Sequence, residues 1–292
     1  MKIALFGGSF DPPHLGHDKI VKEALKLLNL DRLIVMPTFI NPFKYSFFAP
    51  PNLRLNWCKK LWQNLDNVLI SDYEILQNHP VPTIQSVKFL YSKFKIDKFY
   101  LIIGEDNLKD LNKWHKFDEL CGLVEFVVAS RNEVKIKNLI QILPLKKLNI
   151  NVNISSTEFR QNLNKDFIPN SIKSEVINFY KDKKMEKKLE IIKKVLEDKK
   201  AENVEIIDMR NEDYIAKYVV IATTLTGKHG LSLTDDLDAA LKPLGEEFLG
   251  VEASDEWSVI DLGDVIIHLM SEGHRAKYDI EELLAKLKKK EN

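Results

Sequence analysis

The sequence has few of the residues that hold small secreted or zinc-centred proteins together. Only two cysteines occur among its 292 residues, Cys58 and Cys121, too few for a disulfide framework or a cysteine-based zinc site. No apolar run is long enough to cross a membrane. The first apolar run stops at Gly7, too short for the core of a signal peptide. We therefore expect a cytoplasmic protein with no membrane partner.

The sequence also has no net charge, because 43 basic residues balance 43 acidic ones. The two signs are unevenly spread, with 27 basic and 19 acidic residues over 1–184 but 16 and 24 over 185–292. A basic part suits anionic nucleotides, whereas an acidic part is poorly suited to nucleic acid and better suited to a basic protein. The asymmetry indicates two units with different partners, and the chain is long enough for two cores.

Short apolar segments typical of strands alternate with helical patterns in the first part of the chain. Helical patterns cover residues 18–28 and 83–94, for example. The segments expected to be strands are 2–6, 33–36, 68–71, 99–103, 125–129 and 150–154. This alternation predicts an α/β fold, a Rossmann-like parallel sheet with helices on both faces. Ligands of such sheets bind at the carboxyl ends of the strands.

A charged run at residues 181–188 lies within a long stretch without proline or glycine, from Pro169 to Gly227. Apolar residues at helical spacing flank the run: Ile172, Val176 and Phe179 before it, and Leu189, Ile192 and Leu196 after it. The run interrupts this periodicity, as a solvated helical junction does. We place the boundary there, which gives domains at residues 1–182 and 185–292.

The second domain has a different pattern of elements. Helices are expected at 186–198, 232–241 and 280–287, and strands at 204–208, 218–223, 257–261 and 265–270. Because these strands follow one another in pairs, the pattern favours a smaller α/β domain with a mixed sheet over a Rossmann unit.

The most informative motif follows the first strand, where residues 7–17 read GGSFDPPHLGH. A strand that breaks at paired glycines and opens into a helix leaves N–H groups at the helix start, where the dipole favours an anion. His14 and His17 project from nearly the same face of the first helical turn. Gly16 between them lets a polyphosphate approach the backbone. The alternative is that the histidines are a helix cap and a packed core side chain.

A second motif, Ser155-Ser156-Thr157, follows the strand expected at 150–154. Hydroxyl residues cap helices and offer further donors, and Arg160 lies about one turn in, able to clamp phosphate oxygens. By itself this pattern is more often an ordinary capped helix. Together with the histidine motif, it predicts a phosphate-binding site.

From the His-x-Gly-His pattern, the sequence resembles the HxGH nucleotidylyltransferase superfamily, whose members move a nucleotidyl group from a triphosphate to a phosphate acceptor. The inferred reaction is attack of a phosphate monoester on the α-phosphorus of ATP, with release of pyrophosphate. The attacking oxygen is already ionised near neutral pH, so no general base is required. Catalysis then needs alignment and neutralisation of charge on the leaving group, which His14, His17, Lys44, Arg160 and Mg²⁺ can supply.

Residues 1 to about 180 resemble bacterial nicotinate-nucleotide adenylyltransferases. The landmarks, in order, are the opening motif, NPFK at 41–44, Pro82-Thr83, GEDNL at 104–108, Trp114 and the Ser-Ser-Thr-x-x-Arg segment. The resemblance implies that Asp106 contacts nucleotide and that Lys44 meets phosphate. It also implies that Trp114 stacks on the nicotinate ring, that backbone near Thr83 receives the ring carboxylate, and that magnesium is used.

The motifs and the resemblance together give three sets of expected site residues. The catalytic set is His14, His17 and Arg160. The set for ATP and its phosphates is Gly7, Gly8, Ser9, Phe10, Gly104, Asp106, Ser155, Ser156 and Thr157. The set for nicotinate mononucleotide is Lys44, Thr83 and Trp114. No residue is expected to hold a metal by itself, and Mg²⁺ is expected with ATP.

Alternatives remain for single residues. Trp114 is a packed or lid aromatic in the plainer interpretation, and Asp106 a turn-forming residue. The sequence departs from the family at 132–133, where Asn-Glu replaces a common Pro-Gly, and at Phe43, where a polar residue is common. It lacks the Arg-Thr-x-Gly-Ile-Ser segment of glycerol-phosphate cytidylyltransferases, and Trp114 distinguishes it from phosphopantetheine adenylyltransferases.

Residues 185–292 resemble the ribosomal silencing factor family, through segments 213–223, 257–268 and 275–280. The resemblance implies docking on a protein of the large ribosomal subunit and a block on joining of the small subunit. The rival class is an active nucleotidyltransferase, which needs paired metal-binding carboxylates. Asp235, Asp236 and Asp238 do not reproduce that pair, because they spread around a helix, and we interpret them as a solvated acidic cluster at its N-terminus.

Three other residues of the second domain have plain interpretations. His268 is expected to be a satisfied core or edge histidine, and Trp257 and Tyr278 are core or interface anchors. The sequence thus predicts an adenylyltransferase that makes nicotinate adenine dinucleotide, joined to a ribosome-silencing domain that does not read nucleic acid directly. The alternative is a second domain that only dimerises or acts as a scaffold, and a homodimer stays open.

Overall fold

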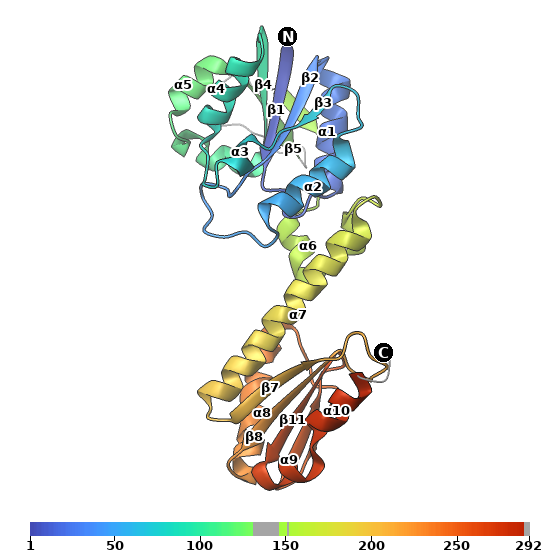
Figure 1. Ribbon diagram of the computed structural model, residues 1–292. Coiled ribbons are helices and arrows are strands. Elements are labelled where there is room, and N and C mark those ends of the chain that lie inside the picture. The colour runs from blue at the N-terminus through green and yellow to red at the C-terminus, as the bar shows by residue number, and fades with distance from the viewer. Residues whose placement is uncertain (131–145, 151, 289–292) are drawn as a thin grey trace. The chain divides into compact units, whose positions relative to one another are not determined.

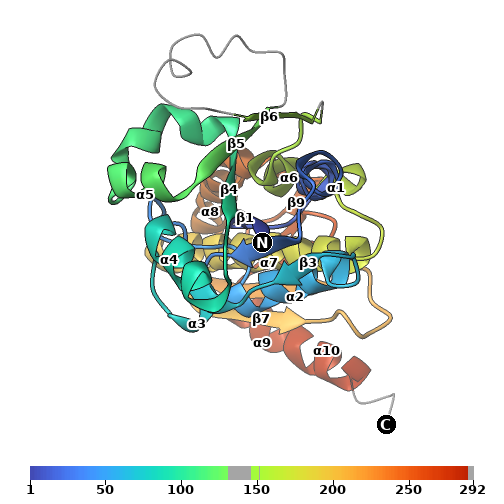
Figure 2. The ribbon, with the colours of Figure 1, turned by 90° about the horizontal axis from the view of Figure 1, so that it is seen from above.

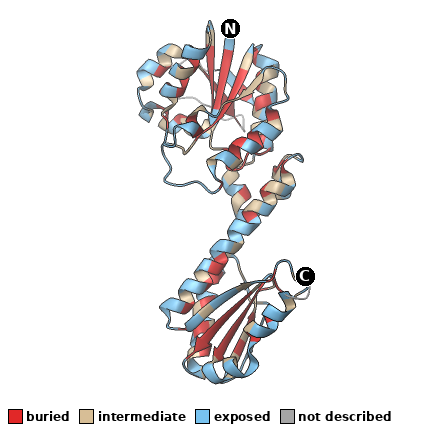
Figure 3. Cartoon of the chain, in the orientation of Figure 1, coloured by how far each residue is buried: buried red, intermediate tan, exposed pale blue. Residues whose placement is uncertain are grey.

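The computed structural model describes residues 1–130, 146–150 and 152–288 (Figure 1). The chain divides into two compact units, Met1–Lys181 and Asp182–Asn292. Each unit has its own sheet, and buried residues gather in the strands of both (Figure 3). Among the described helices, none combines the length and the apolar content that a membrane crossing requires.

The first unit contains a six-stranded parallel sheet with strand order β3-β2-β1-β4-β5-β6. The strands are β1 (Lys2–Gly8), β2 (Arg32–Pro37), β3 (Val68–Ile70), β4 (Lys98–Gly104), β5 (Glu125–Ser130) and β6 (Lys146–Asn149). This is the Rossmann order, which reverses between β1 and β4, and ligands bind at that reversal. The predicted Rossmann-like fold is confirmed.

Helices cover both faces of this sheet, with α4 and α5 on one side and α1 and α2 on the other (Figures 1 and 2). They are α1 (Leu15–Leu28), α2 (Pro51–Trp62), α3 (Tyr73–Leu76), α4 (Thr83–Lys93), α5 (Phe117–Leu123) and α6 (Ser156–Asn162), with 3₁₀ turns η1 (Glu105–Lys113) and η2 (Lys165–Phe167). Successive side chains of a strand point to opposite faces of the sheet, which explains why each face has its own layer of core residues. Ile3 and Leu5 of β1 face α4, whereas Ala4 and Phe6 face α1.

The strand expected at 150–154 is wrong in position. The sixth strand is β6, four residues earlier, and residues 150 and 152–154 are not in a strand; Asn151 lies outside the described residues. The reason lies in the pairing, because β6 reaches the end of β5 when Asn149 meets Ser130. Ser130 is the last residue described before the gap at 131–145, and the described residues after β6 lead to α6.

The second unit contains a five-stranded mixed sheet with order β7-β8-β11-β10-β9. Its strands are β7 (Glu202–Asp208), β8 (Tyr218–Thr224), β9 (Gly250–Ala253), β10 (Trp257–Asp261) and β11 (Val265–Ser271). Among the described strands of this unit, β8 and β11 alone pair in parallel, and the other pairs are antiparallel. The predicted mixed sheet is confirmed, with β9 as an additional edge strand.

Helices also cover both faces of the second sheet. They are α8 (Gly227–Leu241), α9 (Glu272–Tyr278) and α10 (Ile280–Lys288), and η3 (Lys242–Leu244) follows α8. Val220 and Ala222 of β8 pack with α8, whereas Val219 and Ile221 pack with α10. The two sets alternate along β8, as a strand covered on both faces requires.

Helix α8 begins five residues before the expected start at 232. Thr226 caps it, with its hydroxyl accepting from the backbone N–H of His229 at 3.2 Å. The three aspartates at 235, 236 and 238 therefore lie beyond the first turn, and their expected place at the helix N-terminus is wrong. Asp236 pairs with Lys199 at 2.7 Å.

The charged run at 181–188 lies inside one helix, α7 (Lys173–Asp198), so the expected helix start at 186 is wrong. Lysines of the charged run form ion pairs with acidic residues. Lys183 pairs with Glu186 at 2.6 Å, and the buried Lys188 pairs with Glu246 at 2.5 Å. Of these two pairs, only Lys183–Glu186 has the i, i+3 spacing that stabilises a helix from within, since Glu246 lies outside α7.

Candidate active site

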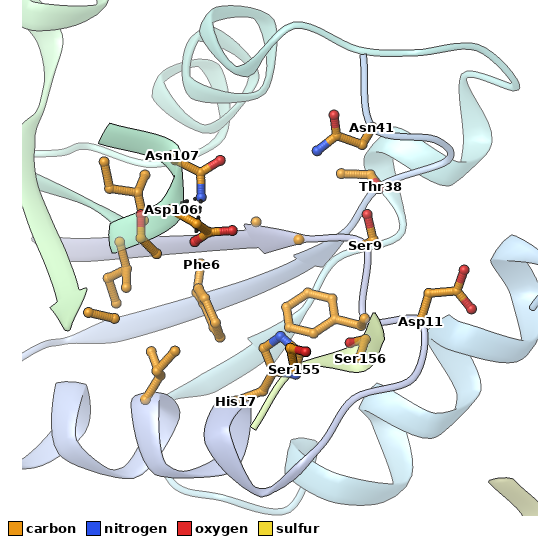
Figure 4. Close-up of a pocket in the computed structure, with 18 of the residues that line it drawn as sticks. Phe6, Ser9, Asp11, His17, Thr38, Asn41, Asp106, Asn107, Ser155 and Ser156 are labelled. Atoms are coloured by element: carbon orange, nitrogen blue, oxygen red, sulfur yellow. Dashed lines mark hydrogen bonds between the residues drawn. The ribbon is translucent and has the colours of Figure 1, made fainter. Parts of the chain in front are cut away.

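A cavity of about 750 Å³ lies at the carboxyl ends of β1 and β4, where the strand order reverses. Every residue that the sequence assigned to the site lines it: Gly7, Gly8, Ser9, Phe10, His14, His17, Lys44, Thr83, Gly104, Asp106, Trp114, Ser155, Ser156, Thr157 and Arg160. Figure 4 shows several of these side chains and the segments that carry them. The structure therefore brings the histidine motif and the serine motif to one place.

The histidine pair is organised by the start of α1. The Nδ1 of His14 accepts from the backbone N–H of Gly16 at 3.1 Å, and the Nδ1 of His17 accepts from the N–H of His14 at 3.2 Å. The two rings stack with centroids 3.7 Å apart. A ring whose Nδ1 accepts carries its proton on Nε2. The cap alternative is thus correct about His14, and both rings nevertheless line the cavity.

The packing of the His14 ring gives a local explanation for a glycine at position 16, besides the expected approach of a polyphosphate. A Cβ at this position would lie 3.0 Å from both Nδ1 and Cε1 of His14. Real Cβ atoms rarely approach so closely, so a side chain here would displace the His14 ring. The missing side chain at Gly16 therefore leaves the space that the His14 ring occupies.

Hydrogen bonds join the second motif to the first. The Oγ of Ser156 donates to the Pro12 carbonyl at 2.9 Å, across 144 positions of sequence. The guanidinium of Arg160 donates to the Asp11 carbonyl at 2.5 Å and to Oγ1 of Thr157 at 3.1 Å. Ser155 caps α6, as expected, by accepting from the N–H of Glu158 at 3.1 Å. Direct contacts thus hold the serine turn against the histidine turn.

Gly104 ends β4 and positions Asp106. A Cβ on Gly104 would lie 2.4 Å from Oδ1 of Asp106. The side-chain amide of Asn107 lies 3.4 Å from the same oxygen. Figure 4 shows Asp106 and Asn107 on the segment that follows β4. A side chain at this position would therefore displace the Asp106 carboxylate from its place.

The residues expected to meet nicotinate mononucleotide lie on separate segments. Thr83 begins α4, and Lys44 lies in an exposed loop after β2. Trp114 is half-buried and packs against the core between the sheet and α4 while it also lines the cavity. The core and the ligand interpretations of Trp114 are therefore compatible. The family departure at 132–133 lies outside the described residues.

Two buried charged residues beneath the site, Arg54 and Asp11, were missed from the sequence as supports of the site. Arg54 of α2 donates to three backbone carbonyls, those of Ser9, Phe39 at 2.7 Å and Ala49 at 2.9 Å. The carboxylate of Asp11 accepts from the N–H groups of Phe48 and Ala49, both at 2.9 Å, and from the Tyr180 hydroxyl.

Burial lowers the pKa of Arg54, and the nearby Asp11 charge opposes this. Together, the two residues fasten the loop after β2 to the histidine motif. A signal existed in the sequence, since Arg54 shares the buried face of α2 with Trp57, Cys58 and Trp62 at helical spacing.

We expect Arg54→Ala to lower the free energy of unfolding of the first unit by about 2–4 kcal/mol. The substitution removes a buried cation and leaves three carbonyls without their donor. Urea unfolding followed by tryptophan fluorescence measures this. Lys59→Ala, an exposed change in the same helix, is the matched control and should unfold like the original chain. Equal stability of the two variants would show that the Arg54 contacts do not hold the loop.

Thr38 is a second residue missed from the sequence. Its hydroxyl lines the cavity just beyond β2, is buried, and has no hydrogen-bond partner within the described ranges. A buried hydroxyl is normally paired, so this one is suited to a ligand. Its position after a strand of a parallel sheet was the available signal.

The second unit differs from expectation at His268. The Nδ1 of this buried ring accepts from the indole N–H of Trp257 at 3.2 Å, but its Nε2 has no partner within the described part of the chain. Burial lowers the pKa of His268 to about 4. The expected satisfied histidine is therefore only half satisfied. Trp257 packs partly into the core, whereas Tyr278 beside it is exposed.

Comparison with known proteins gives the class of each unit. Residues 5–162 match the family model described as cytidylyltransferase-like, more than half of the chain, and the chain belongs to that family. Residues 182–292 match the model described as ribosomal silencing factor during starvation. The resemblances found in the sequence are confirmed for both parts.

Individual relatives indicate which proteins of this family the first unit is similar to. The chain is 52% identical over 183 residues to a probable nicotinate-nucleotide adenylyltransferase of Campylobacter fetus, covering 98% of that protein and 63% of this chain. It is 44% identical over 184 residues to the corresponding protein of Aliarcobacter butzleri, covering 100% of it and 63% of this chain.

A solved structure also resembles this unit. The nicotinic acid mononucleotide adenylyltransferase of Plasmodium falciparum, complexed with NaAD, is 24% identical with a TM-score of 0.50. The match covers 61% of this chain and 93% of that one. At that identity, the likeness shows the fold alone.

Proposed function

We propose that the first unit, residues 1–182, transfers the AMP group of ATP to nicotinate mononucleotide, giving nicotinate adenine dinucleotide and pyrophosphate. One observation carries the proposal. The histidine and serine motifs, joined by the bond from Ser156 to Pro12, line a single cavity at the reversal of a Rossmann sheet. Relatives of the full length of this unit bear the name of that activity.

The proposed chemistry uses donors that line this cavity. A phosphate oxygen of the mononucleotide attacks the α-phosphorus of ATP, and negative charge builds on the leaving pyrophosphate. The Nε2–H groups of His14 and His17 and the guanidinium of Arg160 donate to those oxygens, together with the hydroxyls of Ser155 and Thr157. Donors fixed in place before reaction stabilise this charge more than mobile water does.

Magnesium is proposed to enter with ATP. Mg²⁺ prefers oxygen ligands and usually combines substrate phosphates with one or two carboxylates. Asp106 and Glu105 offer carboxylates to the cavity, so the donor set fits. Within the described ranges, no group of three or more histidine, cysteine, aspartate or glutamate side chains is arranged to hold a metal by itself. When bound, the ion would neutralise negative charge on the phosphates.

The acceptor is proposed to lie between Trp114 and the start of α4. An indole face suits a pyridine ring, and N–H groups at the first turn of α4 suit its carboxylate. Lys44 would then meet the phosphate of the mononucleotide. Thr38, whose hydroxyl has no hydrogen-bond partner among the described residues, would donate to the same ligand.

An acceptor screen tests this function. The full chain with ATP and Mg²⁺ should release pyrophosphate with nicotinate mononucleotide. Activity confined to phosphopantetheine or to glycerol 3-phosphate would contradict the assignment.

For the second unit, residues 185–292, we propose binding to a protein of the large ribosomal subunit and a block on joining of the small subunit. The matching family model supports this, as does the acidic balance of the segment, 24 acidic against 16 basic residues, which suits a basic protein.

The purified chain should sediment with isolated large subunits at low salt and reduce their joining to small ones. No co-migration, with a dimer in sedimentation velocity, would favour the dimerisation or scaffold alternative.

A further inference from the structure

Glu74 of α3 is a buried carboxyl group that lines the cavity and has no role in the mechanism above. Its residue is 5% exposed, and its Oε1 accepts from the hydroxyl of Ser86 at 2.6 Å. Ser86 is itself fully buried on α4, three residues after Thr83. Residues three apart share one face of a helix, so Ser86 holds Glu74 on the face of α4 that carries Thr83, and both Glu74 and Thr83 line the cavity.

The carboxyl group of Glu74 changes its charge state near neutral pH. Burial raises the pKa of Glu74 to about 7, and the Ser86 hydrogen bond acts in the opposite direction. No charged side chain of the surrounding described elements contributes to this shift; those elements carry Arg32 on β2, His79 between α3 and α4, Lys88 on α4, His14 and His17 on α1, Lys44, Asp106 and Lys113. Glu74 is therefore mainly neutral below pH 7 and mainly ionised above it.

The two charge states favour different pyridine substituents. A neutral carboxyl donates a short, strong hydrogen bond to a carboxylate, whereas an ionised carboxyl repels it. A carboxamide can form a hydrogen bond with either charge state of Glu74, since its oxygen accepts from the neutral acid and its NH₂ donates to the ionised one. The state of Glu74 thus affects a 3-carboxylate much more than a 3-carboxamide.

We propose that Glu74, held by Ser86, determines the specificity of the acceptor pocket, selecting pyridine-3-carboxylate over pyridine-3-carboxamide mononucleotides when it is protonated. The inference rests on the proposed function. It adds a residue that reads the ring substituent and makes the selectivity depend on pH.

The test is the ratio of kcat/KM for nicotinate mononucleotide to kcat/KM for nicotinamide mononucleotide, measured with the full chain from pH 6 to pH 8.5. Both nucleotides carry the same phosphate, whose second pKa is about 6, so its titration cancels in the ratio. We expect the ratio to fall about tenfold over this range, with a midpoint near 7, because ionisation removes the donor.

Three variants test whether ionisation of Glu74 causes the pH dependence of the ratio. Glu74→Gln keeps an N–H donor at every pH, so its ratio should not change with pH. Ser86→Ala removes the bond that lowers the pKa, so the midpoint should move to higher pH. Glu119→Gln, an exposed change on α5, should behave like the original chain.

A ratio that is independent of pH in the original chain, or that still falls in Glu74→Gln, would overturn the inference while leaving the adenylyltransferase activity intact. Turnover of neither nucleotide would instead overturn the proposed function and this inference with it.

Discussion

Replacing His14 by serine is expected to lower kcat with nicotinate mononucleotide at least about 100-fold while leaving the fold unchanged. Serine is a strong N-cap, so it can replace the cap that Nδ1 of His14 provides at α1. It cannot replace the Nε2–H that we assign to the phosphate oxygens, and loss of one such donor typically costs about 10²–10³ in kcat. Pyrophosphate release at saturating ATP, together with thermal unfolding, measures both effects.

The serine variant separates the two interpretations of His14. If this residue only caps the helix, the variant keeps both its stability and its activity. His79→Ser is the matched control, since His79 is exposed and belongs to the loop before α4. It should change neither quantity. An active His14→Ser chain would remove His14 from the catalytic set.

Arg160→Lys is expected to lower kcat/KM for ATP by about 10- to 100-fold. The guanidinium reaches both the Asp11 carbonyl and the Thr157 hydroxyl, so it is held at the junction of the two motifs. Lysine keeps the charge but not the planar set of donors, which matters where phosphate is bound at several oxygens. The measurement is initial rate against ATP concentration at saturating acceptor.

Arg210→Lys in the second unit is the control for this prediction. Arg210 forms an exposed ion pair with Asp208, and its replacement should leave the kinetics for ATP as they are. Unchanged kcat/KM in Arg160→Lys would mean that Arg160 supports the loop around Asp11 and does not contact the triphosphate.

The position of the site was predictable because its residues follow strands whose carboxyl ends meet at one edge. Gly7, Gly104 and Ser155 each stand just after an apolar segment, and a parallel sheet brings such segments together. The strand before Ser155 was misplaced, because β6 is set by its pairing with the distant strand β5, from Val127 with Lys146 to Ser130 with Asn149. No local pattern in 150–154 reveals that pairing.

The support beneath the site was not predicted, because it depends on contacts between distant segments. The carboxylate of Asp11 meets Tyr180 across 169 positions, and Arg54 reaches Ser9 across 45. In the second unit, β9 was missed because all four of its residues are exposed and show no apolar alternation. α9 was missed for a related reason, since none of its residues is buried.

The most direct test of the central claim is a crystal structure of the chain with a non-hydrolysable ATP analogue. The account predicts phosphate oxygens within about 3.2 Å of an Nε2 atom of the His14–His17 pair and of a hydroxyl in the Ser155–Thr157 turn. A triphosphate bound away from either motif would contradict it.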